Sequence, residues 1–213
     1  MNKRTKDILV AILAVTAGVA VYFGFFARSE KLNLDTYAVL GAVTAEETAR
    51  LLDAKAQVLV LARGFGDNEN PSGEAELKAF QKALKQHRGL SVVIEKVQAT
   101  PMQMMATGGG LAADQLFKAL ANHANVGAVV LFMGFPPLAD AELEALKKSK
   151  TKIIVVSALH PDYKRLLQRQ AIHLAIVPRP ANELPEARAA LTLRERFDQE
   201  YMIITPAEAT RMP

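Results

Sequence analysis

Apolar and polar residues follow two recurring patterns along most of this chain. Runs rich in apolar residues occur at 57–63, 91–98, 127–134, 152–158 and 172–178. Runs of this length are typical of strands that are buried on both faces of a parallel sheet. Between these runs, large apolar residues recur at intervals of three and four, as in Leu77, Phe80 and Leu84. That spacing indicates amphipathic helices, so the pattern predicts five strands that alternate with helices.

The two ends of this alternating region are less regular. Thr44 and Glu47 fit a capping box, which predicts a short helix from Thr44 to about Ala54 after a link over residues 32–43. Pro161 can open a helix after the fourth strand. A last helix is expected over about 184–199 and leads into an apolar segment at 201–205. This segment forms either a sixth strand at the sheet edge or a clip onto a partner.

Strands that alternate with helices of this length predict βαβ units and a parallel sheet. Right-handed crossovers then place helices on both faces of that sheet. We therefore expect a three-layer, Rossmann-like α/β domain over residues 57–200, with a mostly parallel sheet of five or six strands. The spacing favours the flavodoxin-like strand order 2-1-3-4-5. Residues 201–213 are expected to form a C-terminal strand or tail.

The first 31 residues have a different pattern, which predicts a cytoplasmic stub and a transmembrane helix. Residues 8–27 contain no charged side chain, and 20 residues of helix span about 30 Å, the thickness of a bilayer core. Three basic residues precede this run and two follow it, which favours an N-terminus in the cytoplasm and a domain outside it. A cleaved signal peptide ending near Ala20 and a buried core helix are the alternatives, but the apolar run continues beyond Ala20.

The amino-acid composition excludes several classes of function. The chain has 213 residues, a net charge of +4 and no Cys, so disulfides, Cys-based metal sites and thiol catalysis are excluded. The first 31 residues hold five of the 26 Lys and Arg residues and two of the 22 Asp and Glu residues, which leaves the rest almost neutral. A nucleic-acid partner is not expected, because it requires a concentrated positive face. No cofactor and no metal site are predicted.

Ligands of open α/β sheets bind beyond the carboxyl ends of the strands. Polar side chains and turns at those positions are therefore the candidate ligand-binding residues, and a small polar solute is the expected ligand. They are Arg63, Asp67, Asn68, Asn70, Gly134, Ser157 and His160. Arg179 follows the fifth strand at the same edge. Ser157 and His160 lack the GxSxG elbow of a hydrolase, so we predict no catalytic residue.

Residues 120–134, LANHANVGAVVLFMG, and residues 152–157, KIIVVS, resemble one lobe of a type I periplasmic binding protein. In that family a helix ends just before an apolar strand, and a second apolar strand opens on the ligand cleft. The resemblance covers roughly residues 57–160. It implies an extracytoplasmic, solute-binding fold, but the family closes two lobes around its solute and this chain has room for one.

A second resemblance is to the receiver domains of response regulators. Ser157-Ala158 and Arg179-Pro180 are similar to the Ser/Thr-Ala and Lys-Pro pairs of that family. Met133 stands at or near the position of the phosphoacceptor Asp, and the acidic pair after the first strand is missing. The resemblance therefore implies an inactive relative without a magnesium site.

Two functions remain open from the sequence. The first is a non-catalytic accessory or interaction subunit of a larger bacterial membrane complex, whose docking element is Tyr201, Met202, Ile203 and Ile204. Its partners are the bilayer, through residues 8–27, and other subunits of the complex. The alternative is an extracytoplasmic single-lobe domain that binds or senses a small polar solute. Both place the chain in the cytoplasmic membrane, with its domain in the periplasm.

Overall fold

The computed structural model describes residues 34–53, 55–64, 70–107, 110–156, 162–180 and 192–210. The predicted membrane segment at residues 8–27 lies outside these ranges. None of the described helices is long and apolar enough to span a membrane. Residues 34–213 form one compact unit, and the segment at 201–204 belongs to it.

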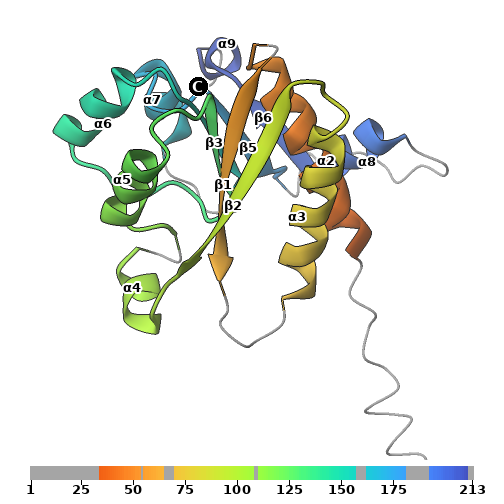
Figure 1. The fold of residues 1–213 in the computed structure, drawn as a ribbon, viewed down its shortest axis with the longest axis horizontal. Helices are drawn as coiled ribbons and strands as arrows, with labels where there is room; N and C mark the ends of the chain where they lie inside the picture. Colours follow the sequence, from red (N-terminus) through yellow and green to blue (C-terminus); the bar gives the residue numbers. More distant parts are fainter. Residues whose placement is uncertain are drawn as a thin grey trace, which may run out of the picture. The chain divides into compact units, whose positions relative to one another are not determined.

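The described strands form one sheet in the order β2-β1-β3-β4-β5-β6 (Figure 1). Strands β1 to β5 are parallel, and β6 pairs with β5 in the antiparallel direction. The predicted order 2-1-3-4-5 is therefore confirmed. The strands are β1 (Ala56–Gly64), β2 (Leu90–Gln98), β3 (Ala128–Leu131), β4 (Lys152–Val156), β5 (Leu174–Pro178) and β6 (Tyr201–Ile204).

Helices cover both faces of the sheet, so the three-layer α/β prediction is confirmed. One face carries α2 (Leu34–Arg50), α3 (Pro71–Leu84) and α8 (Leu193–Glu200), while the other carries α5 (Ala113–Asn122), α6 (Asp140–Lys147) and α7 (Tyr163–Gln168) (Figure 1). Two short helices, α4 (Pro101–Ala106) and α9 (Pro206–Ala209), lie at opposite ends of the sheet (Figure 1).

The central strands divide their side chains between two hydrophobic cores. Leu59 and Leu61 of β1 face α5, α6 and α7, whereas Val58 and Val60 face α2 and α3. All four side chains are fully buried. This alternation follows from the two-residue period of a strand, and it explains why β1 reads as a continuous apolar run.

The first described helix differs from its prediction. The sequence predicted a link over residues 32–43 and a helix that begins at Thr44, but α2 is already helical at Leu34. Thr44 lies inside this helix, where its hydroxyl donates a 2.7 Å hydrogen bond to the Leu40 carbonyl oxygen. Glu47 does not complete a capping box, because its carboxylate accepts hydrogen bonds from Arg50 and Arg194. The predicted capping box is therefore wrong, because buried polar residues inside a helix can have the same spacing.

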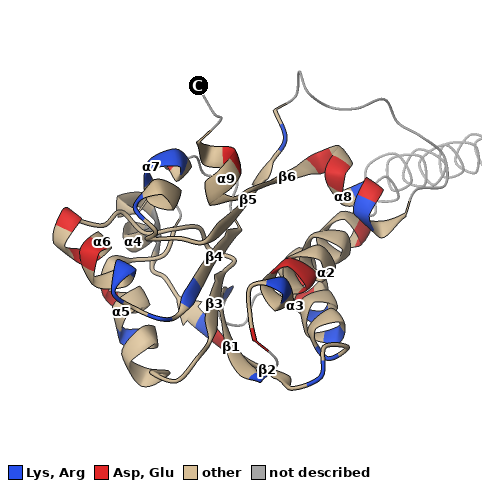
Figure 2. Ribbon diagram, turned by 90° about the horizontal axis from the view of Figure 1, so that it is seen from above, with Lys and Arg blue, Asp and Glu red and all other residues tan. Residues whose placement is uncertain are grey.

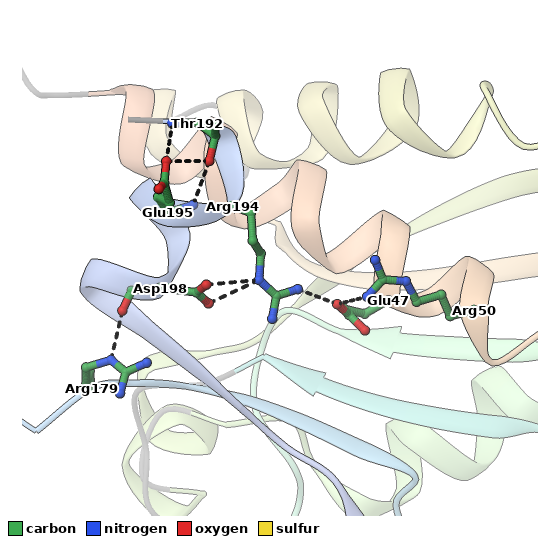
Figure 3. Close-up of polar contacts among 7 residues, drawn as sticks. All are labelled: Glu47, Arg50, Arg179, Thr192, Arg194, Glu195 and Asp198. Atoms are coloured by element: carbon green, nitrogen blue, oxygen red, sulfur yellow. Dashed lines mark hydrogen bonds and ion pairs between the residues drawn. The ribbon is translucent and has the colours of Figure 1, made fainter. Parts of the chain in front are cut away.

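The carboxylate of Glu47 links the first described helix, α2, to α8 (Figure 3). Its Oε1 lies 2.6 Å from Nη1 of Arg50 and 2.6 Å from Nη1 of Arg194 in α8. Arg194 also pairs with Asp198 one turn further along α8, at 3.1 Å. The Glu47 side chain is only 10% exposed, so two guanidinium groups compensate a carboxylate that has lost most of its water.

Further polar contacts hold α8 in this place. Thr36 donates to Glu200 at 3.0 Å, and Arg196 lies 3.4 Å from Asp35. Arg179, after β5, donates from Nε to the Asp198 carbonyl oxygen at 2.9 Å, at the carboxyl end of α8. A positive charge is favourable there, because the last carbonyl groups of a helix carry partial negative charge. The Arg179 side chain thus stabilises the end of α8 and is not oriented toward the loops of the predicted ligand site.

His173, just before β5, connects two neighbouring strands. The Ile153 amide of β4 donates a 3.2 Å hydrogen bond to Nδ1 of His173. Burial, with a contribution from Lys152, lowers the pKa of His173 to about 4. The imidazole is therefore neutral at physiological pH, as its role as a hydrogen-bond acceptor requires.

Helices α2 and α3 cross at Gly41 without room for a side chain. A Cβ atom placed on Gly41 would lie 2.0 Å from the Glu76 carbonyl oxygen, which is a backbone atom of α3. This close approach lets Val39, Leu40 and Val43 reach the same core as Leu77.

We predict that Gly41→Ala lowers the free energy of unfolding by about 1–3 kcal/mol, because the added methyl group forces the two helices apart. Gly73→Ala in α3 is the matched control. Its Cβ would meet only the Asn70 side-chain amide, which can rotate away, so this variant should gain up to about 1 kcal/mol from helix propensity. Urea denaturation of both variants measures the difference, and equal stabilities would contradict the close crossing.

Candidate functional site

The carboxyl ends of β1 to β5 meet at one edge of the sheet, which we call the carboxyl edge. Arg63 and Gly64 end β1, and they pair in register with Val97 and Gln98 at the end of β2. Asn70 follows at the start of α3, also at this edge. The structure therefore brings Arg63 and Asn70 to the edge at which the sequence predicted a ligand.

An amide cluster covers the ends of β1 and β2. A Cβ atom on Gly64 would lie 2.3 Å from Nε2 of Gln98, so the Gln98 side chain lies directly over Gly64. Gln115 of α5 donates from Nε2 to the Gln98 carbonyl oxygen at 3.1 Å. Side-chain amides offer both hydrogen-bond donors and acceptors, which are the groups that a hydroxyl-rich solute requires. Arg63 ends the same strand, but successive residues of a strand point to opposite faces, so its side chain leaves the sheet on the face opposite Gly64 and the Gln98 amide.

Gln98 and Gln115 were missed by the sequence reasoning. Gln98 directly ends a strand, so the rule that selected Arg63 could have selected it too. Gln115 could not have been found, because it lies inside a helix and reaches the edge only through the packing of α5 beside β2.

Asn70 precedes α3 but makes no side-chain hydrogen bond to cap the described part of that helix. Its carbonyl oxygen instead accepts from the Glu74 amide at 3.0 Å. The side-chain amide lies beside Gly73, because a Cβ atom there would be 2.4 Å from Nδ2. Asn70 is half-buried.

Gly134 shapes the loop that follows β3. Its φ of 78° lies in the left-handed region, which glycine adopts without strain. The turn buries Met133 and Phe135 on either side of it, and their carbonyl oxygens lie against Gly110 of the neighbouring loop. Gly134 is itself buried and has no side chain, so it contributes the path of the backbone at this edge.

Four of the predicted ligand residues lie outside the described residues. They are Asp67, Asn68, Ser157 and His160. They remain candidates from the sequence alone. In the described ranges, no group of three or more His, Asp and Glu side chains is arranged to hold a metal ion.

An open groove of about 830 Å³ lies beside the edge strand β2. Its walls are the start of α2, one side of α3 and two residues of β2. They comprise Leu34, Pro71, Glu74, Ala75, Leu77, Lys78, Gln81, Ile94 and Lys96. The predicted ligand residues are not part of this groove, and an ion pair between Lys96 and Glu74 crosses it.

The predicted docking residues lie in β6 and form the described edge of the sheet beyond β5. Ile204 is 3% exposed and belongs to the core beneath α7, while Tyr201 and Ile203 pack on the opposite core with Phe197. Met202 is half-buried on the α7 side. Their side chains thus serve the domain itself, and what β6 offers a partner is its outer backbone edge.

Glu76 is a titratable group at the α2–α3 crossing. Burial raises the pKa of this carboxyl from 4.5 to about 8. Burial also raises the pKa of Tyr201 to about 12, and the charges of Glu200 and Glu76 add to that shift. Glu76 is half-buried, and its neutral form is favoured there.

No family model and no curated protein matches this sequence. Solved structures do match its fold. AraP, an arabinose-binding protein from Geobacillus stearothermophilus, has a TM-score of 0.55 at 14% identity, over 84% of this chain and 63% of its own. A solute-binding protein of an ABC transporter from Agrobacterium vitis, bound with alpha-D-tagatopyranose, has a TM-score of 0.54 at 15% identity, over 81% and 57%.

A third similar structure is a periplasmic solute-binding protein from Actinobacillus succinogenes with bound D-allose. Its TM-score is 0.54 at 12% identity, over 84% of this chain and 61% of its own. The resemblance to a lobe of a type I periplasmic binding protein is thus confirmed at the level of the fold. This chain spans about 57–63% of the length of these three proteins. The likeness to receiver domains stays a prediction.

We predict that Glu76→Gln makes the protein more stable at pH 8 than the native sequence and changes its stability little at pH 4.5. The folded state favours the neutral carboxyl, so the native protein loses stability as the pH rises from about 4.5 through about 8, whereas the amide cannot ionise. Melting temperatures at both pH values measure the effect.

The control for this comparison is Glu74→Gln, on the same helix but exposed and paired with Lys96. This variant should not gain stability at pH 8. A Glu76→Gln variant with the same stability difference at both pH values would show that the carboxyl is not buried in the folded protein.

Proposed function

We propose that this chain is a membrane-anchored, non-catalytic domain that binds or senses a small hydroxyl-rich solute outside the cytoplasm. The observation that carries the proposal is the pair of side-chain amides, Gln98 and Gln115, at the carboxyl edge of a fold shared with sugar-binding proteins. Arg63, Gln98 and Gln115 would contact the solute or hold the groups that do. Asn70 lies at the same edge, at the start of α3.

The chemistry of these groups supports a sugar over a charged ligand. Side-chain amides both donate and accept hydrogen bonds, so they match hydroxyl groups without a preference for charge. Two of the similar proteins were solved with D-tagatopyranose and D-allose, which are solutes of this kind. The anchor at residues 8–27 and the location in the periplasm are parts of the proposal that rest on the sequence.

We predict that a matching sugar stabilises the full-length protein in detergent. At one hundred times its Kd, a ligand adds about 2.7 kcal/mol, which raises the melting temperature by about 5–10 °C for a domain of this size. The first sugars to test are arabinose, tagatose and allose. Arg63→Ala and Gln98→Ala should each abolish the shift.

The control is Gln86→Ala, which removes an exposed amide in the turn after α3, at the opposite edge of the sheet. This variant should keep the full shift. A panel in which no sugar changes the melting temperature, or a shift that Gln98→Ala leaves intact, would contradict the proposed site.

An accessory subunit of a membrane complex is the second candidate, and the edge position of β6 favours it. Among the described strands, β6 pairs only with β5, so one side of its backbone can accept a further strand. Edge strands of this kind bind extended segments of other proteins through main-chain hydrogen bonds.

For this second candidate, we expect the protein to migrate in a larger complex after mild-detergent extraction from its native membrane. Met202→Lys should release it, because a charge on an edge strand opposes strand addition. Met202→Leu, which keeps an apolar side chain of similar size, should leave the complex intact. Native gels with mass spectrometry distinguish the outcomes, and migration as a single chain would rule out this candidate.

A further inference from the structure

The short helix α4 exposes two large apolar side chains. Met102 is 80% exposed and Met105 is 85% exposed, and they are the most exposed large apolar residues of the described chain. A capping box at Thr100 fixes the start of α4, where the Thr100 hydroxyl and the Gln103 side chain satisfy each other's backbone amides. The two methionines are therefore held outward by an ordered element, and they do not pack into the domain.

The segment of the chain that contains α4 carries no charge. No residue from 97 to 113 is Lys, Arg, Asp or Glu. In Figure 2, α4 accordingly shows neither of the two charge colours. Exposed apolar side chains on an uncharged segment are expected where a surface contacts an apolar medium, because no charged group has to lose its water there.

The chain enters the domain at this same edge. Leu34 begins α2 and lines the groove together with Pro71, the first residue of α3, and Lys96, near the end of β2. Figure 1 shows the start of α2, the start of α3 and α4 all at the end of the sheet to which the arrow of β1 points. The carboxyl edge is therefore the edge nearest to whatever precedes residue 34.

The predicted membrane segment ends at Ala27, and seven residue steps separate it from Leu34. A fully extended chain covers about 25 Å in that number of steps. With residues 8–27 as the anchor of the proposed function, this length is the reach of the link between that anchor and Leu34. A tether of this length gives a weak surface contact an effective concentration in the millimolar range, so that even a small apolar contact is populated.

We propose that the carboxyl edge faces the lipid bilayer and that Met102 and Met105 of α4 lie in its interface. Methionine suits this position because it is apolar and flexible and adapts to an irregular environment. The inference rests on the anchor of the proposed function but not on its solute.

The experiment uses the full-length protein in vesicles of phosphatidylcholine and phosphatidylglycerol. Because the native chain has no Cys, Met105→Cys carries a single environment-sensitive fluorophore. Lys150→Cys, an exposed position between α6 and β4 at the opposite edge, is the matched control. We expect a blue shift at position 105 and a loss of its emission when the lipids carry a quencher, with neither change at position 150.

Each other outcome overturns the proposal. Water-like emission at both positions, in protein that floats with the vesicles and melts like the native chain, would place α4 away from the lipid. Shielding of position 105 in native membranes but not in pure lipid would identify a protein partner instead. Failure to float with the vesicles would remove the anchor on which the inference rests. Met102→Cys repeats the test at a second position, so a local effect of one label cannot decide it.

Discussion

A buried carboxylate connects the beginning of this domain to its end. Glu47 lies in the last turn of α2, the first described helix, and its charge is compensated by Arg50 on the same helix and by Arg194 on α8. The pairing fixes α8 against α2, and α8 in turn places the fully buried Phe197 in the core and leads directly into β6. Breaking the ion pair would leave a carboxylate that water cannot fully reach. The loss of stability would then affect every element that α8 positions. The sixth strand therefore depends on a contact made far from it in the sequence.

The parts of the fold that could be predicted are those that depend on neighbouring residues. The five parallel strands and their order followed from apolar runs and from the rules for right-handed crossovers. The start of α2 could not be predicted, because Thr44 and Glu47 show the spacing of a capping box while their partners are Leu40 and Arg194. Arg194 lies 147 residues away from Glu47, and no local pattern reveals such a partner. The same limit applies to β6, whose role became clear only when β5 was placed beside it.

The candidate site shows a similar division. The rule that ligands bind at the carboxyl ends of strands selected Arg63 and Asn70, and the structure brings both to that edge. It could not select Gln115, which reaches the edge because α5 packs beside β2, nor could it exclude Arg179, whose guanidinium binds the end of α8. Position along a strand can be read from the sequence, whereas the direction of a long polar side chain depends on the elements packed around it.

A single lobe poses a physical problem for solute binding. Proteins with two lobes close around a sugar and remove most of it from water, and that burial supplies much of the affinity. The amides of Gln98 and Gln115 lie at the carboxyl edge of one lobe. A second wall at the carboxyl edge would have to come from outside this lobe. The chain enters at that edge through Leu34, and the exposed methionines of α4 point to an apolar surface there. In an anchored lobe whose open edge lies against another surface, that surface would therefore enclose the solute from the membrane side. It would replace the second wall that the lobe itself does not provide.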